Sequence, residues 1–82
     1  MKGTTFEVWF NNTEERSLIL ETLYKRGYYW LGQKRWTPPI VRGYIHFSFD
    51  RRVLSYGTRI GKPLLDNQIS ISQLVYESEE FE

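Results

Sequence analysis

The chain contains no cysteine, one histidine, one methionine and three prolines among its 82 residues. Without cysteine, it has neither a disulfide framework nor a thiolate zinc site. No apolar run approaches the roughly 20 residues that a membrane-spanning helix needs. Residues 1–5 also lack the apolar stretch of a signal peptide. We therefore expect a cytoplasmic protein that does not enter the membrane and carries no cofactor.

Aromatic residues are abundant and make up 17% of the chain, including three tryptophans. A domain of this size buries only about 60% of the surface that its unfolded chain exposes. Large aromatic side chains must therefore supply much of the core. We expect one domain over residues 1–76, followed by an acidic tail at residues 77–82.

Charge is distributed unevenly, although the formal net charge is only +1. Between residues 25 and 62, nine basic side chains stand against one acidic side chain, Asp50, which gives this segment a net charge of +8. The tail at residues 77–82 holds four acids and no base. A basic segment of this size attracts phosphates or acidic protein surfaces.

The first predicted elements are a strand at residues 5–10 and a helix at residues 13–26. In the strand, Phe6, Val8 and Phe10 alternate with outward-facing Thr5, Glu7 and Trp9. Asn12 is a favourable N-cap, with Glu15 three residues later, and Gly27 is a natural helix stop. The expected apolar stripe of the helix consists of Ile19, Leu20, Leu23 and Tyr24.

Four further strands are expected at residues 28–31, 44–49, 53–56 and 69–71. In the second of these, Ile45, Phe47 and Phe49 should face the core and Tyr44, His46 and Ser48 should face away. After residue 71, either Ser72 caps one helical turn through residue 76 or the strand continues.

The predicted fold is α+β in the order β-α-β-β-β-β, with one helix packed on a mainly antiparallel sheet of four to five strands. The face opposite the helix is expected to present Trp9, Tyr44 and His46 among basic loops.

The common hydrolytic chemistries find no support. His46 is the only candidate triad histidine. Asp50 lies four residues further on, about 13 Å away at the rise of a strand, which is beyond hydrogen-bond reach. Residues 57–63 faintly resemble a phosphate-binding loop, but their glycines are too close together and Pro63 replaces the Ser or Thr that holds magnesium. We expect a protein that is not an enzyme.

Basic residues interleave with aromatics over residues 28–36, a composition typical of single-strand binding. Residues 42–49 also resemble the longer signature of the RNA-recognition motif, matching at Arg42, Gly43, Tyr44 and Phe49 and departing at Ile45, His46 and Phe47. That family has a second helix after its third strand, whereas residues 50–61 indicate a strand and a glycine-containing loop.

A resemblance to small accessory proteins of tailed bacteriophages covers residues 5–75. Residues 23–30 are similar to the "LxxxGYxW" of those proteins, residues 52–57 to their "LxYG", and residues 69–74 to their closing "EISLEDL"; a tyrosine-containing strand lies between, at residues 44–47. The resemblance implies a viral protein that binds and inhibits a host factor without catalysis, in the host cytoplasm. It transfers no functional residues, because the matching positions look structural.

The leading hypothesis is therefore a binding protein with a basic and aromatic contact surface, since aromatics and arginine dominate binding hot spots. For Trp30 and Trp36 the alternative is that they fill the core. Direct binding of single-stranded nucleic acid or a nucleotide messenger, and homo-oligomerisation through exposed strand edges, remain alternatives. The candidate contact residues are Trp30, Lys34, Arg35, Trp36, Tyr44, His46, Arg51, Arg52, Arg59 and Lys62.

Overall fold

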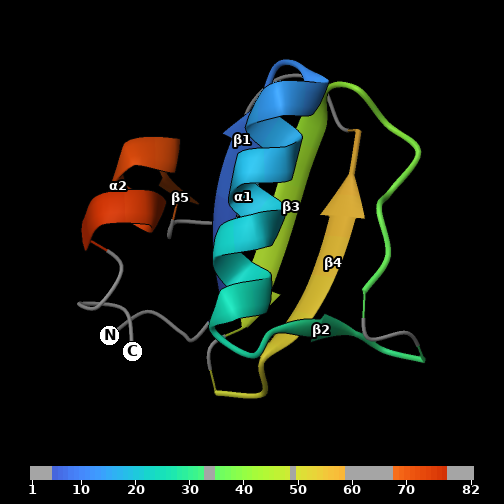
Figure 1. The fold of residues 1–82 in the computed structure, drawn as a ribbon, viewed down its shortest axis with the longest axis vertical. Helices are drawn as coiled ribbons and strands as arrows, with labels where there is room; N and C mark the ends of the chain where they lie inside the picture. The colour runs from blue at the N-terminus through green and yellow to red at the C-terminus, as the bar shows by residue number, and fades with distance from the viewer. Residues whose placement is uncertain (1–4, 33–34, 49, 59–67, 78–82) are drawn as a thin grey trace.

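The computed structural model describes residues 5–32, 35–48, 50–58 and 68–77. They form an α+β fold with two helices and one five-stranded sheet (Figure 1). The elements are, in chain order, β1 (Thr5–Phe10), α1 (Thr13–Lys25), β2 (Tyr29–Trp30), β3 (Gly43–Ser48), β4 (Val53–Gly57), β5 (Gln68–Ile69) and α2 (Ile71–Glu77).

The sheet is mixed, with strand order β2-β4-β3-β1-β5. β3 pairs antiparallel with both β1 and β4, whereas the two edge strands are parallel to their neighbours. For β2 the cause is α1, which carries the chain back along the sheet so that β2 runs in the same direction as β1. A mainly antiparallel sheet is therefore correct only for its three central strands.

The strand boundaries differ from the expected ones mainly at the edges. β2 and β5 each contain only two residues, so Tyr28, Leu31 and Ile71 are not in strands. Ile45 and Phe47 face the core as predicted, while Phe49 lies outside the described residues. The turn into β4 holds Arg52 at φ +59°, a left-handed conformation uncommon outside glycine.

Local capping explains both ends of α1. Asn12 Oδ1 accepts a hydrogen bond from the Glu15 backbone N–H at 2.8 Å, and the Glu15 carboxylate accepts one from the Asn11 N–H at 2.7 Å. At the other end, Gly27 adopts φ +87°. The Gly27 N–H donates to the Tyr24 carbonyl, and the Tyr28 N–H donates to the Leu23 carbonyl, both at 3.1 Å. This double closure is a Schellman motif, which the glycine permits.

The second helix corrects the expectation of a single helix. α2 begins at Ile71, and its cap is Ser70 rather than Ser72: Ser70 Oγ accepts from the Gln73 N–H at 3.1 Å, and Gln73 Oε1 accepts from the Ser70 N–H at 2.9 Å. This reciprocal pair is a capping box. Leu74 of α2 is fully buried, and Arg26 donates to its carbonyl at 3.0 Å, which ties α2 to α1.

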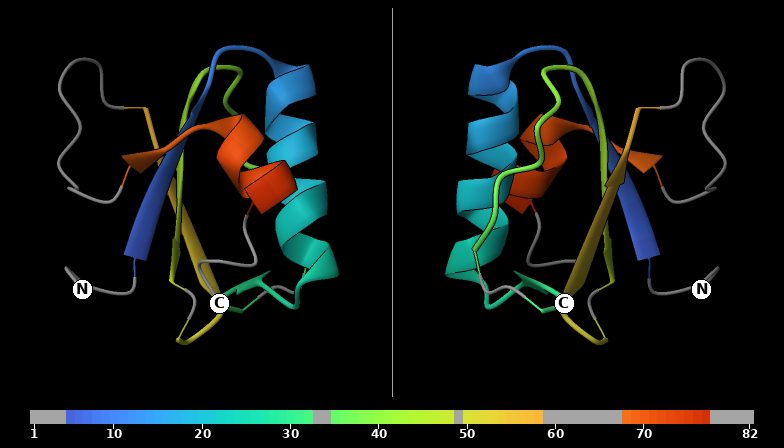
Figure 2. Two further views of the ribbon diagram at one scale, coloured as in Figure 1. Left: turned by 90° about the vertical axis from the view of Figure 1, so that its left-hand side faces the viewer. Right: turned by 90° about the vertical axis from the view of Figure 1, so that its right-hand side faces the viewer.

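Both helices lie on the same side of the sheet, and the core lies between them and the strands (Figure 2). The segment from Trp36 to Ile40 packs against the same core, and Pro38 within this segment is fully buried. Arg16 of α1 fastens this segment by donating from Nη1 to the carbonyls of Pro38 and Ile40, at 3.3 and 2.7 Å. Neither helix of the described part is long and apolar enough to cross a membrane.

Candidate partner-binding surface

The hydroxyl of Tyr24 joins three segments next to β2. It accepts hydrogen bonds from Trp30 Nε1 at 2.7 Å and from the Trp36 backbone N–H at 3.1 Å, and it donates to the Trp36 carbonyl. Tyr24 therefore connects α1, β2 and the segment that follows β2. The positions of Trp30 and Trp36 are fixed by these bonds as well as by packing.

The two tryptophans meet a tyrosine of β4 in an aromatic cluster. Trp36 stands edge-on to Trp30, with ring centroids 5.1 Å apart, and Tyr56 lies 5.9 Å from Trp30 and 5.4 Å from Trp36. The edge-to-face arrangement of the tryptophans is a favourable geometry for aromatic pairs. Trp30 is only 6% exposed and belongs to the core, whereas Trp36 is half-buried and Tyr56 is 39% exposed.

Two adjoining pockets share Trp30 as a common wall. The larger, of about 560 Å³, lies beside the C-terminal end of α1 and is lined mainly by aromatic residues, with Arg35 as its cation. The smaller, of about 330 Å³, lies between Leu31, Trp36 and the β4 residues Leu54, Ser55 and Tyr56. Leu31, at its rim, is 74% exposed.

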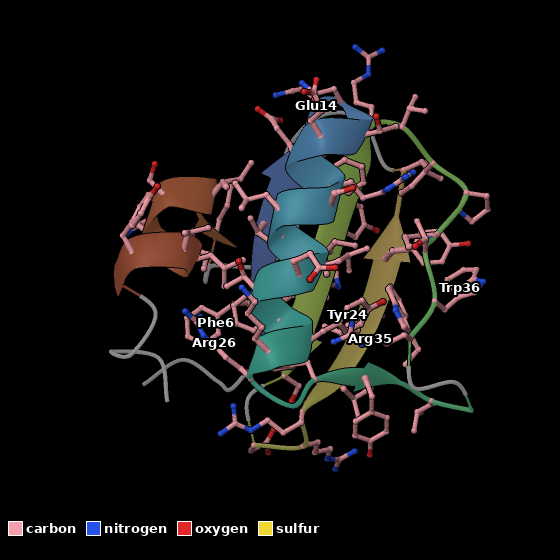
Figure 3. All side chains as sticks on the ribbon, in the orientation of Figure 1. Phe6, Glu14, Tyr24, Arg26, Arg35 and Trp36 are labelled. Carbon is pink, nitrogen blue, oxygen red and sulfur yellow. The ribbon has the colours of Figure 1, made fainter. Side chains whose placement is uncertain are left out.

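Arg35 supplies a positive charge in the larger pocket. Its guanidinium carbon lies 4.9 Å from the ring centroid of Tyr24, so the cation rests on an aromatic face while the residue as a whole stays exposed. Figure 3 shows Arg35 next to Tyr24 beside α1, and Trp36 on the side of the molecule away from α2. We call Leu31, Arg35, Trp36 and Tyr56, together with Trp30 beneath them, the edge patch.

The opposite face of the sheet holds a separate polar and aromatic cluster. Tyr44 stacks on His46 with ring centroids 4.5 Å apart and contacts Trp9 at 5.2 Å. Trp9 Nε1 donates to Glu7 Oε2, and a hydrogen bond of 2.8 Å joins His46 Nε2 to Glu7 Oε1. Glu7 is fully buried although it points away from the helices, and its carboxylate is the centre of this cluster.

The structure divides the predicted contact residues among three locations. Trp30, Arg35 and Trp36 lie together in the edge patch, and Tyr44 and His46 lie on the opposite face of the sheet. Arg51 and Arg52 belong to the β3–β4 turn, where Arg52 lies over the ring of Tyr28 at 5.1 Å and Arg51 is exposed. Lys34, Arg59 and Lys62 lie outside the described residues.

Sequence reasoning missed Tyr24, Leu31 and Tyr56 as contributors to the surface. Tyr56 carried a signal, since it shares a strand face with Leu54 and therefore points to the side of the core. Tyr24 appeared only as a core residue of the helix stripe. Its hydroxyl bonds to Trp30 and Trp36, which lie 6 and 12 residues further along the chain. The hydrophobic periodicity of the helix does not predict contacts with residues outside the helix.

Within the described residues, no three side chains of His, Cys, Asp or Glu gather closely enough to hold a metal ion. The edge patch is an accessible grouping that combines aromatic side chains, a cation and two adjoining pockets. None of the family models, curated proteins or solved structures compared with this chain matches it.

Proposed function

We propose that this chain is a small non-enzymatic binding protein that recognises a partner protein through the edge patch. The observation that carries the proposal is the juxtaposition of exposed Leu31, Tyr56 and Arg35 with pockets walled by Trp30. Tryptophan, tyrosine and arginine are the residues enriched in binding hot spots. Their surface here is concave and apolar with one cation, as a protein anchor site requires.

The edge patch is also held in place before any partner arrives. The Tyr24 hydroxyl fixes Trp30 and Trp36, and Arg16 fastens the segment that carries Trp36. Side chains that are already ordered lose little conformational entropy on binding, which raises affinity for a given contact area. This favours recognition of a defined surface over loose electrostatic attraction.

The resemblance to bacteriophage accessory proteins supports a biological setting in which the partner is a bacterial host factor. A bound protein of this size inhibits by covering a surface that the host factor needs, so it requires no catalytic group. The basic character of residues 25–62 favours a partner with an acidic surface.

The test of this proposal is capture of partners from a bacterial lysate by the tagged protein, with and without nuclease. We expect a retained protein whose amount is unchanged by nuclease and falls less than about threefold between 50 and 200 mM salt, because aromatic anchors depend little on counterion release. Loss of the partner on nuclease treatment, or binding of the purified protein to single-stranded DNA or RNA, would favour the nucleic-acid alternative and contradict the proposal.

A further inference from the structure

β4 exposes part of its hydrogen-bonding edge next to the edge patch. β2 pairs only with the first two residues of β4, Val53 and Leu54. The remaining residues, Ser55 to Gly57, pair with β3 on one side and have no strand partner on the other among the described residues. Within the described part of the chain, β4 is therefore an edge strand over its C-terminal half.

The backbone groups on this edge that have no partner among the described residues belong to Tyr56. The Tyr29 N–H donates to the Arg52 carbonyl at 3.0 Å, so this carbonyl faces the β2 side of the strand. Because backbone groups alternate between the two edges of a strand, the N–H and C=O of Tyr56 face that same side. No residue in the described part of the chain bonds to them.

A pocket lies directly beside these backbone groups. The 330 Å³ pocket is formed by Ser55 and Tyr56 of β4 on one side and by Leu31 and Trp36 on the other, with Trp30 as its floor. An extended peptide beside β4 would direct every second side chain to the face that carries this pocket. Backbone pairing plus a pocket for alternate side chains is the requirement for recognition by strand addition.

The charged residues near this edge favour a negatively charged occupant. Arg35 belongs to the edge patch, and Arg42 precedes Gly43, the first residue of β3, whose next residue Tyr44 pairs with Gly57 at the C-terminal end of β4. Among the described residues from 27 to 58, Asp50 is the only acidic residue. It lies near the opposite end of β4, and its carboxylate accepts a hydrogen bond from the Ser48 hydroxyl. The other charged side chains described between residues 27 and 58 are basic, namely Arg35, Arg42, Arg51 and Arg52, and an acidic segment complements this charge.

We propose that the edge of β4 at Ser55–Gly57 binds an acidic, extended segment of a partner protein as an added strand, with an apolar or aromatic side chain of that segment in the pocket between Leu31, Trp36 and Tyr56. The inference rests on the proposed function and adds to it the mode of recognition and the chemistry of the recognised segment.

The test uses a synthetic peptide with blocked termini, Glu-Thr-Glu-Phe-Glu-Thr-Glu. Its sequence reads the same in both directions, so it presents the same order of side chains whether it pairs parallel or antiparallel to β4. We expect it to bind the full chain by calorimetry, and the peptide with Lys in place of Glu to bind at least about 10-fold more weakly because it meets the arginines. Tyr56→Ala should weaken binding of the acidic peptide, whereas Tyr76→Ala, at an exposed position of α2, should not.

Two N-methylated peptides distinguish binding by backbone pairing with β4 from binding through side chains alone. One carries N-methyl groups on its Thr and Phe residues, and the other carries them on its two inner Glu residues. Since neighbouring N–H groups point to opposite edges, one methylated peptide should lose about 10-fold or more in affinity and the other about twofold or less.

Three results would overturn the inference: no binding of the unmodified acidic peptide at about 1 mM, equal binding of the Lys peptide, or equal effects of the two methylation patterns. If a protein captured from the lysate still depends on Trp36 and Tyr56 in those cases, the proposed function stands and only the strand-addition mode fails.

Discussion

Replacing Phe47 with alanine is expected to lower the free energy of unfolding by about 3–5 kcal/mol, the usual cost of deleting a buried phenylalanine. Phe47 is almost fully buried on β3, the central strand of the sheet. Its ring stacks on Phe6 and meets the edge of Tyr28, with both centroids 5.5 Å away. An alanine at this position leaves a cavity between β1, β3 and Tyr28. The surrounding elements cannot move far enough to fill it.

This loss is large for a domain of this size, whose total stability should be about 4–12 kcal/mol. The urea midpoint should fall strongly with an unchanged m-value. Phe47→Leu should cost only about 1–1.5 kcal/mol because it keeps most of the volume, and Leu18→Ala, at an exposed helix position, should cost about 0.5 kcal/mol or less. A loss under about 1 kcal/mol for Phe47→Ala would contradict the described core.

Glu7→Ala should cost about 2–4 kcal/mol, the second large effect, because it removes a buried acceptor from two donors. Trp9 Nε1 and His46 Nε2 both bond to the Glu7 carboxylate, which is fully shielded from solvent. Without it, both half-buried nitrogens lose this acceptor. Glu7→Gln should cost less, since the amide keeps one acceptor oxygen.

A double-mutant cycle with His46→Ala measures this coupling. The double variant should lose less stability than the sum of the two single variants, by about 0.5–3 kcal/mol, because the second substitution removes a group that the first has already left unpaired. Additive losses would show that the contact between Glu7 and His46 contributes nothing. Because the cluster lies on the face opposite the helices, folded Glu7 variants should retain partner binding through the edge patch.

The elements that local signals specify were predicted well. Alternation of apolar residues placed β1 and most of β3, and Asn12 with Gly27 bounded α1 to within one residue. Ser70 and Gln73 also form a local capping signal, but from the sequence the cap is assigned to Ser72, with a continued strand as the alternative. The error lay in choosing between neighbouring serines.

The features that depend on distant contacts were not predictable in the same way. The parallel edges of the sheet follow from how α1 returns the chain, and the burial of Glu7 follows from partners on β3. The contact surface itself was anticipated as one basic and aromatic face. The structure instead places Tyr44 and His46 on the opposite face of the sheet from Trp36. Alternation along β3 directs Tyr44 and His46 away from the core, whereas the segment that carries Trp36 packs against the core.

The central claim is that the edge patch is the surface that meets a partner. Its most direct test is the affinity of the captured partner for the double variant Trp36→Ala/Tyr56→Ala, compared with Tyr76→Ala, which removes an aromatic ring that is 83% exposed on α2. Urea unfolding establishes that both variants are folded. We predict at least about a 10-fold loss of affinity for the double variant and about twofold or less for Tyr76→Ala. Equal affinity of the two folded variants would contradict the assignment.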